Sequence, residues 1–253
     1  MKNFDQTVIQ YFRQEAELSI HYLSIDCVVF GFHEGRMRVL LLRWKGTNEW
    51  SLPGGFIRKT ESADAAAVRI LRERTGLQQL FLQQFHIFGD AIRYDEEDTW
   101  RRIGFPVDRS KWSERTISLG YYALVEYAEV TPRPDLLSDA CDWWSLDELP
   151  NLLFDHNHII DVALAGLRRQ LPYQPISHLL PETFTMPELQ RLYETILGRT
   201  LDARNFYKKV QASGILQRTD ERRTGTPYKS PYLYRFDPVA YPAVIRGGHL
   251  SFL

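Results

Sequence analysis

With 253 residues, of which 44% are hydrophobic and 25% charged, the chain has the composition of a globular protein and is long enough for two domains. No apolar run approaches the roughly 20 residues of a membrane span, and acidic residues interrupt the apolar positions near the N-terminus, which argues against a signal peptide. We therefore expect a cytoplasmic protein without a membrane partner, in which Cys27 and Cys141 are free, buried thiols.

The net charge of −1 is unevenly distributed. From Pro172 onward the chain has eleven Lys and Arg and seven Asp and Glu residues, a net charge of +4, whereas the preceding part has a net charge of −5. A basic C-terminal part attached to an acidic body favours an anionic partner for that part. A difference of this size also arises by chance, so charge alone does not identify the partner.

The first part of the chain mixes strands and helices. The spacing of apolar residues predicts a short helix over residues 4–18, and two β-like runs, 24–32 and 37–44, predict a hairpin around the turn at 33–36. The polar segment 93–115 has no such pattern and is predicted to be a long loop that borders a pocket. The other elements expected here are a helix at 61–75 ended by Gly76, strands at Phe81–Phe88, 117–127 and 142–146, a helical turn at 147–150 and an amphipathic helix at 156–171.

A change of pattern follows residues 171–175, which contain two prolines and are the predicted linker between domains 1–171 and 172–253. Apolar residues at helical spacing predict a helix at Met186–Leu197, and Asp202 is suited to cap a second helix at Ala203–Ala212. Two strands are expected next, at 215–218 and Tyr232–Phe236, on either side of a basic loop. Helix, turn, helix and β-hairpin is the order of a winged helix-turn-helix domain.

The second of these helices would expose a basic face. If Phe206 and Val210 point inward, the outward residues are Arg204, Asn205, Lys208 and Lys209. Arg and Asn suit the edges of guanine and adenine. The wing would contribute phosphate contacts from Arg218, Arg222, Arg223 and Lys229. A solvated face on an ordinary helix is the alternative, but helical order, basic wing and net charge together favour binding of double-stranded DNA.

Residues 54–77 have the spacing of the Nudix box, Gly-x5-Glu-x7-Arg-Glu-U-x-Glu-Glu-x-Gly-U, where U is a bulky aliphatic residue. The positions in register are Gly55, Glu61, Arg69, Leu71, Glu73, Gly76 and Leu77. Two positions differ: Ile70 and Arg74 replace glutamates of the box. The first part of the chain thus resembles the Nudix family, which implies an α/β/α sandwich of the α+β class, followed here by the winged helix-turn-helix domain.

The two departures affect chemistry more than fold. Nudix hydrolases cleave diphosphates with Mg²⁺ or Mn²⁺, hard cations that need several carboxylate oxygens, and one helix face normally supplies them. Here that face offers Glu73 alone, because Ile70 cannot bind a cation and Arg74 repels one. We therefore expect no catalytic residue, no metal and no cofactor, with Glu61 and Arg69 paired to hold the glycine loop on its helix and that helix shaping a ligand pocket.

An atypical hydrolase is the alternative. It would use Glu73 with a base from outside the box, one of Asp95, Glu96, Glu97 or Asp98.

A degenerate Nudix domain joined to a winged helix resembles the Nudix-related transcriptional regulators, most of all the AraR-type regulators of Bacteroidetes. The matching stretches are Ile25-Asp26-Cys27, Trp50-Ser51-Leu52, Gly54-Gly55-Phe56, Thr75-Gly76-Leu77, Tyr121-Tyr122-Ala123-Leu124, Phe154-Asp155-His156 and Arg204-Asn205-Phe206. The resemblance implies a homodimer on a pseudo-palindromic operator, with a sugar such as a pentose as small-molecule effector. The related NrtR regulators imply ADP-ribose or a similar nucleotide instead.

Effector contacts require polar groups for hydroxyls and an aromatic face for the apolar side of a sugar. Candidates near the glycine loop and the strand ends are Asp26, Trp50, Arg93, Tyr121 and His156. Each could equally have a structural role. Trp50 and Tyr121 in particular have the character of core residues.

Overall fold

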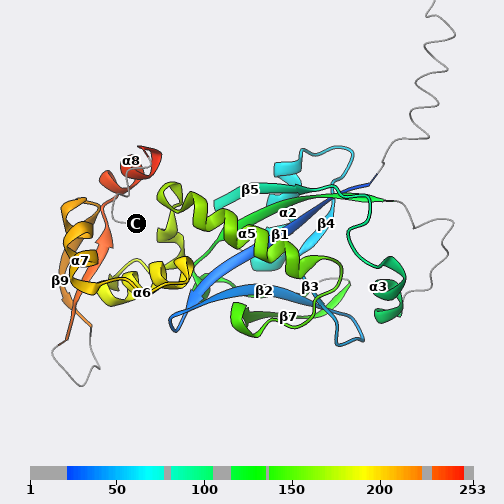
Figure 1. Ribbon diagram of the computed structural model, residues 1–253, viewed down its shortest axis with the longest axis horizontal. Coiled ribbons are helices and arrows are strands. Elements are labelled where there is room, and N and C mark those ends of the chain that lie inside the picture. Colours follow the sequence, from blue (N-terminus) through cyan, green and yellow to red (C-terminus); the bar gives the residue numbers. More distant parts are fainter. Residues whose placement is uncertain (1–21, 77–80, 105–114, 135–136, 224–229, 248–253) are drawn as a thin grey trace, which may run out of the picture.

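The structure, a computed structural model, describes residues 22–76, 81–104, 115–134, 137–223 and 230–247. Two parts follow one another along the long axis of the molecule (Figure 1). The helix predicted at 4–18, and the residues Leu77 and Lys229, lie outside the described part. Within that part, none of the helices has the length and apolar character needed to cross a membrane.

A seven-stranded sheet forms the centre of the N-terminal part, with the order β3-β2-β1-β6-β5, while β4 pairs with β1 and β7 with β2. β1 and β6 are parallel, and the other pairs are antiparallel. The strands are β1 Tyr22–His33, β2 Arg36–Trp44, β3 Trp50–Ser51, β4 Gly54–Phe56, β5 Phe81–Phe88, β6 Thr116–Leu124 and β7 Ser138–Ser145.

The predicted hairpin between β1 and β2 is confirmed. Its register pairs His33 with Arg36, which leaves a two-residue turn in which Glu34 and Gly35 have φ values of 50° and 74°. Two positive φ values match the twist of a tight hairpin, and glycine supplies one of them without steric cost.

Two helices cover opposite faces of this sheet (Figure 1). On β1, Ile25, Cys27 and Val29 pack on the side of α2 (Ala63–Thr75), whereas Val28 and Phe30 belong to the core on the side of α5 (His156–Gln170). This alternation is the period of two expected of a strand buried on both faces. The predicted α/β/α sandwich is therefore confirmed. Cys27 and Cys141 are free thiols, and Cys141 is only half-buried.

The segment predicted as a loop at 93–115 contains a helix, α3 (Glu96–Arg102). The backbone N–H of Asp98 donates to the Asp95 side chain, which caps this helix. Because the helix is polar on nearly all sides, it has no apolar period that a sequence pattern could reveal. The strand expected to reach residue 127 ends at Leu124, and Tyr127–Glu129 form the 3-10 helix η1. The turn expected at 147–150 is η2 (Leu146–Glu148).

The C-terminal part has the predicted order of elements. α6 (Met186–Leu197) and α7 (Ala203–Ala212) have the expected bounds, and β9 (Leu216–Arg222) pairs with β10 (Tyr232–Phe236). The pattern did not indicate the two-residue strand β8 (Phe184–Thr185) beside β10, or α8 (Ala240–Gly247). Gly198, with φ 67°, ends α6, and the Asp202 side chain accepts from the Asn205 N–H at the start of α7.

The predicted linker is a packed connection rather than an exposed one. It runs through two short helices, η3 (Leu171–Tyr173) and η4 (Ile176–Leu179), in which Leu171 and Ile176 are buried. One continuous apolar core includes residues of both parts. Between them, the Thr195 hydroxyl donates to the Gly35 carbonyl at 3.1 Å.

The box residues fasten the glycine turn to α2, as predicted. Arg69 donates from Nε and Nη2 to the two carboxylate oxygens of Glu61, at 3.0 and 2.6 Å, and also to the Phe56 carbonyl. Glu73 lies 4.0 Å from Arg69. Ile70 is 1% exposed, and a Cβ added to Gly55 would lie 3.4 Å from its Cδ1. The isoleucine therefore fills core space beneath the glycine turn.

We expect Glu61→Gln to lower the free energy of unfolding at pH 7 by an amount that shrinks in acid. Hydrogen bonding to Arg69 lowers the pKa of Glu61 from 4.5 to about 2. Because the folded-state pKa is the lower one, the stabilisation is present above about pH 4.5 and is lost as the pH falls towards 2. Urea denaturation between pH 7 and pH 3 measures the difference. Glu148→Gln, which removes an exposed partner of Arg36, is the control, and a pH-independent difference would contradict the prediction.

Candidate functional site

A cavity of about 270 Å³ opens where β1, β4 and the start of α5 meet. Ser24 and Asp26 reach it from β1, and Gly54, Gly55 and Phe56 from β4. No α2 side chain that the structure describes lines it. Of the described residues of the box region, the glycine segment and Phe56 reach the cavity. This cavity therefore gives no support to the expectation that the box helix shapes a ligand pocket, and that expectation stays a prediction.

Asp26 is the centre of a buried polar network beside the cavity. The Ser118 hydroxyl donates to its Oδ2, His156 Nε2 lies 3.4 Å from Oδ1, and Arg93 Nη2 lies 3.7 Å from Oδ2. Burial raises the pKa of Asp26, but His156, the Ser118 hydrogen bond and the Arg93 charge outweigh it, so that the pKa is below its ordinary value. Asp26 is therefore ionised at neutral pH.

Arg93 is held by a second carboxylate. It donates from Nε and Nη2 to the two oxygens of Asp155, at 2.8 and 2.7 Å, and both side chains are more than nine-tenths buried. Such bidentate, charge-assisted bonds are the strong class of side-chain hydrogen bonds. Asp155 stands at the N-cap position of α5 without capping it, because its carboxylate bonds to Arg93.

His156 has a defined tautomer in this arrangement. The backbone N–H of Leu52 donates to its Nδ1 at 2.9 Å, so the proton of the neutral ring is on Nε2, the nitrogen that faces Asp26. Three of the five candidate effector residues, Asp26, Arg93 and His156, are thus brought together at the cavity.

The close approach of the glycine turn to this network requires a glycine. A Cβ on Gly54 would lie 2.7 Å from Asp26 Oδ1 and 2.9 Å from the Ile25 carbonyl oxygen. Any side chain at this position would push β4 away from β1 or displace the Asp26 carboxylate.

The other two effector candidates lie elsewhere. Trp50 packs edge-on against Trp144, with ring centroids 5.2 Å apart. Tyr121 is 3% exposed on the α2 side of the sheet, where its hydroxyl donates to Asp64 at 2.6 Å. Neither residue lines the cavity, and their role in effector binding stays a prediction.

An aromatic wall, which the sequence did not single out, borders the cavity. It consists of Trp44, Tyr94 and Phe154. The Phe154 ring lies 5.2 Å from Tyr94 and 6.2 Å from Trp44, and its backbone has a φ of 58°. This conformation is uncommon for a non-glycine residue, and strained residues of this kind cluster at functional sites. The one sequence signal was the position of Phe154 directly before Asp155-His156.

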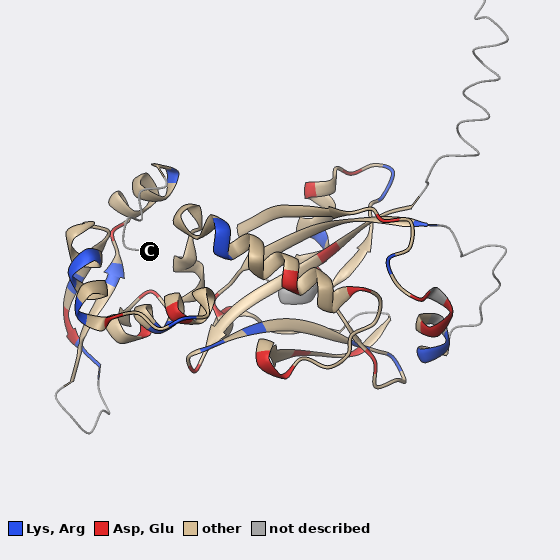
Figure 2. Cartoon of the chain, in the orientation of Figure 1, with Lys and Arg blue, Asp and Glu red and all other residues tan. Residues whose placement is uncertain are grey.

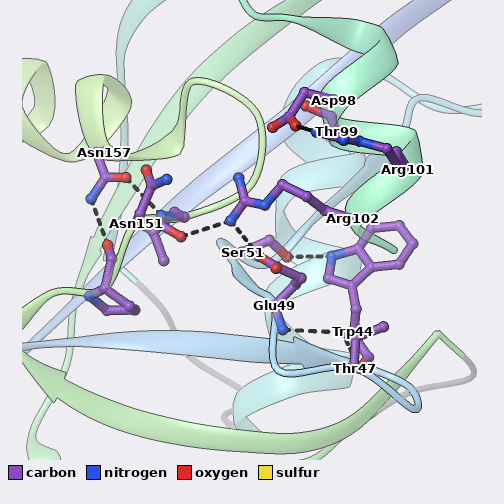
Figure 3. A network of polar contacts seen from close by, with 12 residues as sticks. Trp44, Thr47, Glu49, Ser51, Asp98, Thr99, Arg101, Arg102, Asn151 and Asn157 are labelled. Atoms are coloured by element: carbon purple, nitrogen blue, oxygen red, sulfur yellow. Dashed lines mark hydrogen bonds and ion pairs between the residues drawn. The ribbon is translucent and has the colours of Figure 1, made fainter. Parts of the chain in front are cut away.

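α3 is tied to the structure next to the cavity (Figure 3). Arg102 bonds to Glu49 and donates to the Asn151 carbonyl oxygen at 3.1 Å. Of the acids proposed as an alternative base, Asp95 caps α3 and Asp98 pairs with Arg101. Among the described residues, no cluster of three or more His, Cys, Asp or Glu is arranged to hold a metal ion.

The predicted basic residues of α7 are exposed, and Figure 2 shows Lys and Arg positions along this helix in blue. Phe206 and Val210 are 3% and 0% exposed, so they form the inward face as expected. The outward residues are Arg204, Asn205, Lys208 and Lys209, joined by Tyr207 and Gln211, which sequence analysis missed. Their signal was the helical position: Tyr207 and Gln211 lie one turn from Arg204 and Lys208.

The wing arginines have different partners. Arg223 donates to both carboxylate oxygens of Glu188, at 2.6 Å each, so its charge is compensated within the domain. Arg218 and Arg222 lie over the ring of Tyr232. Lys229 is outside the described residues.

Comparisons with known proteins agree with this architecture. The NUDIX domain model matches residues 21–164, and the NrtR DNA-binding winged helix domain model matches residues 176–236. The ADPR responsive transcriptional repressor NtrR of Acinetobacter baylyi is 28% identical over 232 residues, which cover 88% of this chain and 85% of that protein.

Two solved structures extend the similarity to three dimensions. The crystal structure of Shewanella oneidensis NrtR superposes with a TM-score of 0.66 at 27% identity, covering 87% of this chain and 96% of that chain. The structure of the same protein complexed with a 27mer DNA gives a TM-score of 0.67 at 26% identity, covering 87% and 95%. The chain belongs to the Nudix family, and it joins a Nudix domain to the winged helix domain of the NrtR regulators, to which it is homologous.

Proposed function

We propose that this protein is a transcriptional regulator whose winged helix domain binds an operator and whose Nudix domain binds, without hydrolysing it, a nucleotide of the ADP-ribose type. The observation that carries the proposal is the combination of a preformed cavity in a box-deficient Nudix domain with an exposed basic helix α7 in the same chain. The similarity to an ADPR responsive repressor over 88% of the chain supports it.

A nucleotide fits the cavity better than the sugar that the AraR resemblance implies. Aromatic rings border the cavity, and every base has a flat face that stacks on such rings. A second, smaller cavity shares Arg93, Tyr94 and Thr116 with the first and adds Arg115. The second cavity is also lined by Asp90, and Arg93 is paired with Asp155, so Arg115 is the cation there that could meet a phosphate. A base linked to phosphate would use both the rings and this cation, whereas a free pentose has neither group.

The absence of hydrolysis rests on the box positions. Ile70 is buried in the core, and Arg74 replaces the second of the paired glutamates. Glu73, which is retained, is half exposed and close to Arg69. One carboxylate does not supply the several oxygens that Mg²⁺ requires.

ADP-ribose should bind and remain intact. Calorimetry should detect binding, and chromatography after incubation with Mg²⁺ or Mn²⁺ should recover the unmodified nucleotide. Tyr94→Ala should weaken binding by roughly tenfold, within the range of about 1–3 kcal/mol for loss of a base–aromatic stack. Tyr173→Ala, an exposed tyrosine that lines neither cavity, should leave the ADP-ribose affinity unchanged. Metal-dependent release of AMP by the pure protein would refute the non-enzymatic proposal, and tight binding of arabinose in place of ADP-ribose would refute the effector class.

The double variant Arg204→Ala with Lys208→Ala should lose specific operator binding, since a base contact is worth about 1–3 kcal/mol. Gel shift with DNA from the neighbouring operon measures the affinity, and thermal unfolding checks the fold. Arg36→Ala with Arg101→Ala removes the same charge from the Nudix domain and is the control. Equal affinities of the two double variants would place the DNA interface elsewhere.

We also expect a homodimer, because a pseudo-palindromic operator presents two equivalent half-sites.

We further propose that α5 couples the cavity to the DNA-binding domain. At its start, Asp155 and His156 belong to the polar network of the cavity. In its last turn, Arg168 donates from Nε to the Ile196 carbonyl oxygen at the end of α6, at 2.6 Å. α6 leads directly into the turn before α7. A ligand that displaces Arg93 or Tyr94 would therefore act on a rigid helix whose far end holds α6.

Arg168→Ala should reduce the effect of ADP-ribose on operator affinity while leaving ADP-ribose affinity nearly unchanged in the absence of DNA. The coupling free energy between two such sites is about 1–3 kcal/mol, and we expect the variant to lose a large part of this coupling. Fluorescence anisotropy with labelled operator, with and without ADP-ribose, measures the change in operator affinity that the nucleotide causes. Arg169→Ala, the exposed neighbour, is the control. An unchanged response in Arg168→Ala would exclude this contact from the coupling.

A further inference from the structure

Two arginines of the wing share one aromatic ring. The guanidinium carbon of Arg222 lies 3.8 Å from the ring centroid of Tyr232, and that of Arg218 lies 4.6 Å from the same centroid. The strand register explains the arrangement, because Tyr232 pairs with Arg222 and Tyr234 with Arg218. β9 is irregular between these two pairs, so that both arginines reach the ring although they are four residues apart.

The positive charges of the two arginines are not compensated by a carboxylate within the described residues. Neither Arg218 nor Arg222 forms an ion pair with a carboxylate of the described part, including Asp220 and Glu221 of the same strand. Arg222 donates from Nη1 to the Ser230 carbonyl oxygen, which carries no net charge. Arg223, one residue further on, is paired with Glu188. Both guanidinium carbons lie within 4.6 Å of the same ring centroid, so an anion at this edge of the hairpin is attracted by both charges.

The ring is also connected to α7. Tyr234, two residues along β10 on the same face as Tyr232, has its hydroxyl 3.4 Å from the hydroxyl of Tyr207 on α7. Gln211 of α7 donates to the Tyr207 hydroxyl at 2.8 Å. The hairpin face that carries both arginines therefore adjoins the helix proposed to enter the major groove, where the DNA backbone would run.

We propose that Tyr232 is a positioning residue that holds Arg218 and Arg222 as a clamp for a DNA phosphate. This inference rests on the proposed DNA-binding function. It adds that the Tyr232 ring positions the two arginines and that the group they bind is a phosphodiester of the DNA backbone. Stacking on the ring fixes the planes of both guanidinium groups before binding, so less side-chain entropy is lost when a phosphate is bound.

The test compares three variants in operator binding across a salt series. Tyr232→Phe keeps the ring and should retain affinity within twofold. Tyr232→Leu keeps an apolar side chain but removes the ring, and should weaken binding by about two- to fivefold for each arginine, the size of an exposed cation–π contact. It should also lower the slope of log affinity against log salt by about 1, the value of one lost phosphate contact. Arg235→Gln removes a charge from the other face of the hairpin and should change affinity little.

A phosphate contact carries no sequence information, so Tyr232→Leu should weaken binding to operator and to unrelated DNA by the same factor. In the background of Arg218→Gln with Arg222→Gln, Tyr232→Leu should add no further loss, which distinguishes positioning from a general packing role. Thermal unfolding of each variant checks the fold.

Three results would overturn the clamp while leaving the proposed function intact. They are an unchanged salt slope in Tyr232→Leu, a loss confined to the operator, and a loss in Tyr232→Leu that persists in the double-arginine background. If the parent protein binds no DNA at all, the proposed function and the clamp fail together.

Discussion

The buried fork between Arg93 and Asp155, with Asp26 beside it, is the interaction on which the arrangement of the Nudix domain depends. It joins three segments that are distant in sequence: the start of β1, the segment after β5 and the start of α5. All three side chains are nearly removed from solvent. Removing one partner of such a pair costs about 3–5 kcal/mol, because a buried charge is left uncompensated. The network therefore stabilises the fold, and because Asp26 and Arg93 line the cavity, it also makes that part of the cavity wall polar.

The elements that the sequence predicted well are those with local signals. α6 and α7 have strong apolar periods, with Gly198 ending α6 and Asp202 capping α7, and their predicted bounds match the structure. α3 was missed because it is polar on nearly every side, and its stability comes from the Asp95 cap and from the bonds of Arg102 to Glu49 and Asn151. No pattern within 93–115 could indicate those partners, since they lie about 50 residues away along the chain.

The site shows why proximity in sequence to a motif is a weak guide to a pocket. Asp26 lies on β1, which pairs with the glycine segment β4, and Tyr121 lies on β6, which pairs with β1. The register pairs Tyr121 with Cys27, the neighbour of Asp26. Paired residues of adjacent strands share a face. Tyr121 therefore faces α2 with Cys27, and Asp26 faces the cavity. The alternation of side chains between the two faces of a strand could have shown that these two candidates face opposite sides of the sheet. The aromatic wall had only the signal of Phe154 directly before Asp155-His156, because Trp44, Tyr94 and Phe154 come from three separate segments.

The Nudix box in this chain separates two roles that one helix usually combines. Glu61 and Arg69 keep the glycine turn attached to α2, and this role needs no metal. Ile70 instead fills the core beneath Gly55. A glutamate there would carry a charge into an apolar layer, so the isoleucine favours stability where a hydrolase needs a ligand.

The continuous core between the two domains limits how a ligand signal could travel in the proposed regulator. Leu171 and Ile176 of the connection are buried, and the core of the sheet extends into that of the winged helix domain. A close-packed interface of this kind has low compressibility and moves as a unit or changes between discrete arrangements. A flexible tether would lose the signal, whereas a helix anchored at the cavity by Asp155 and at α6 by Arg168 would transmit a small rotation over its full length. In the proposed regulator, the direction of α7 relative to the Nudix domain would then be the quantity that the ligand controls, and the two half-sites of an operator would sense it as a change in spacing.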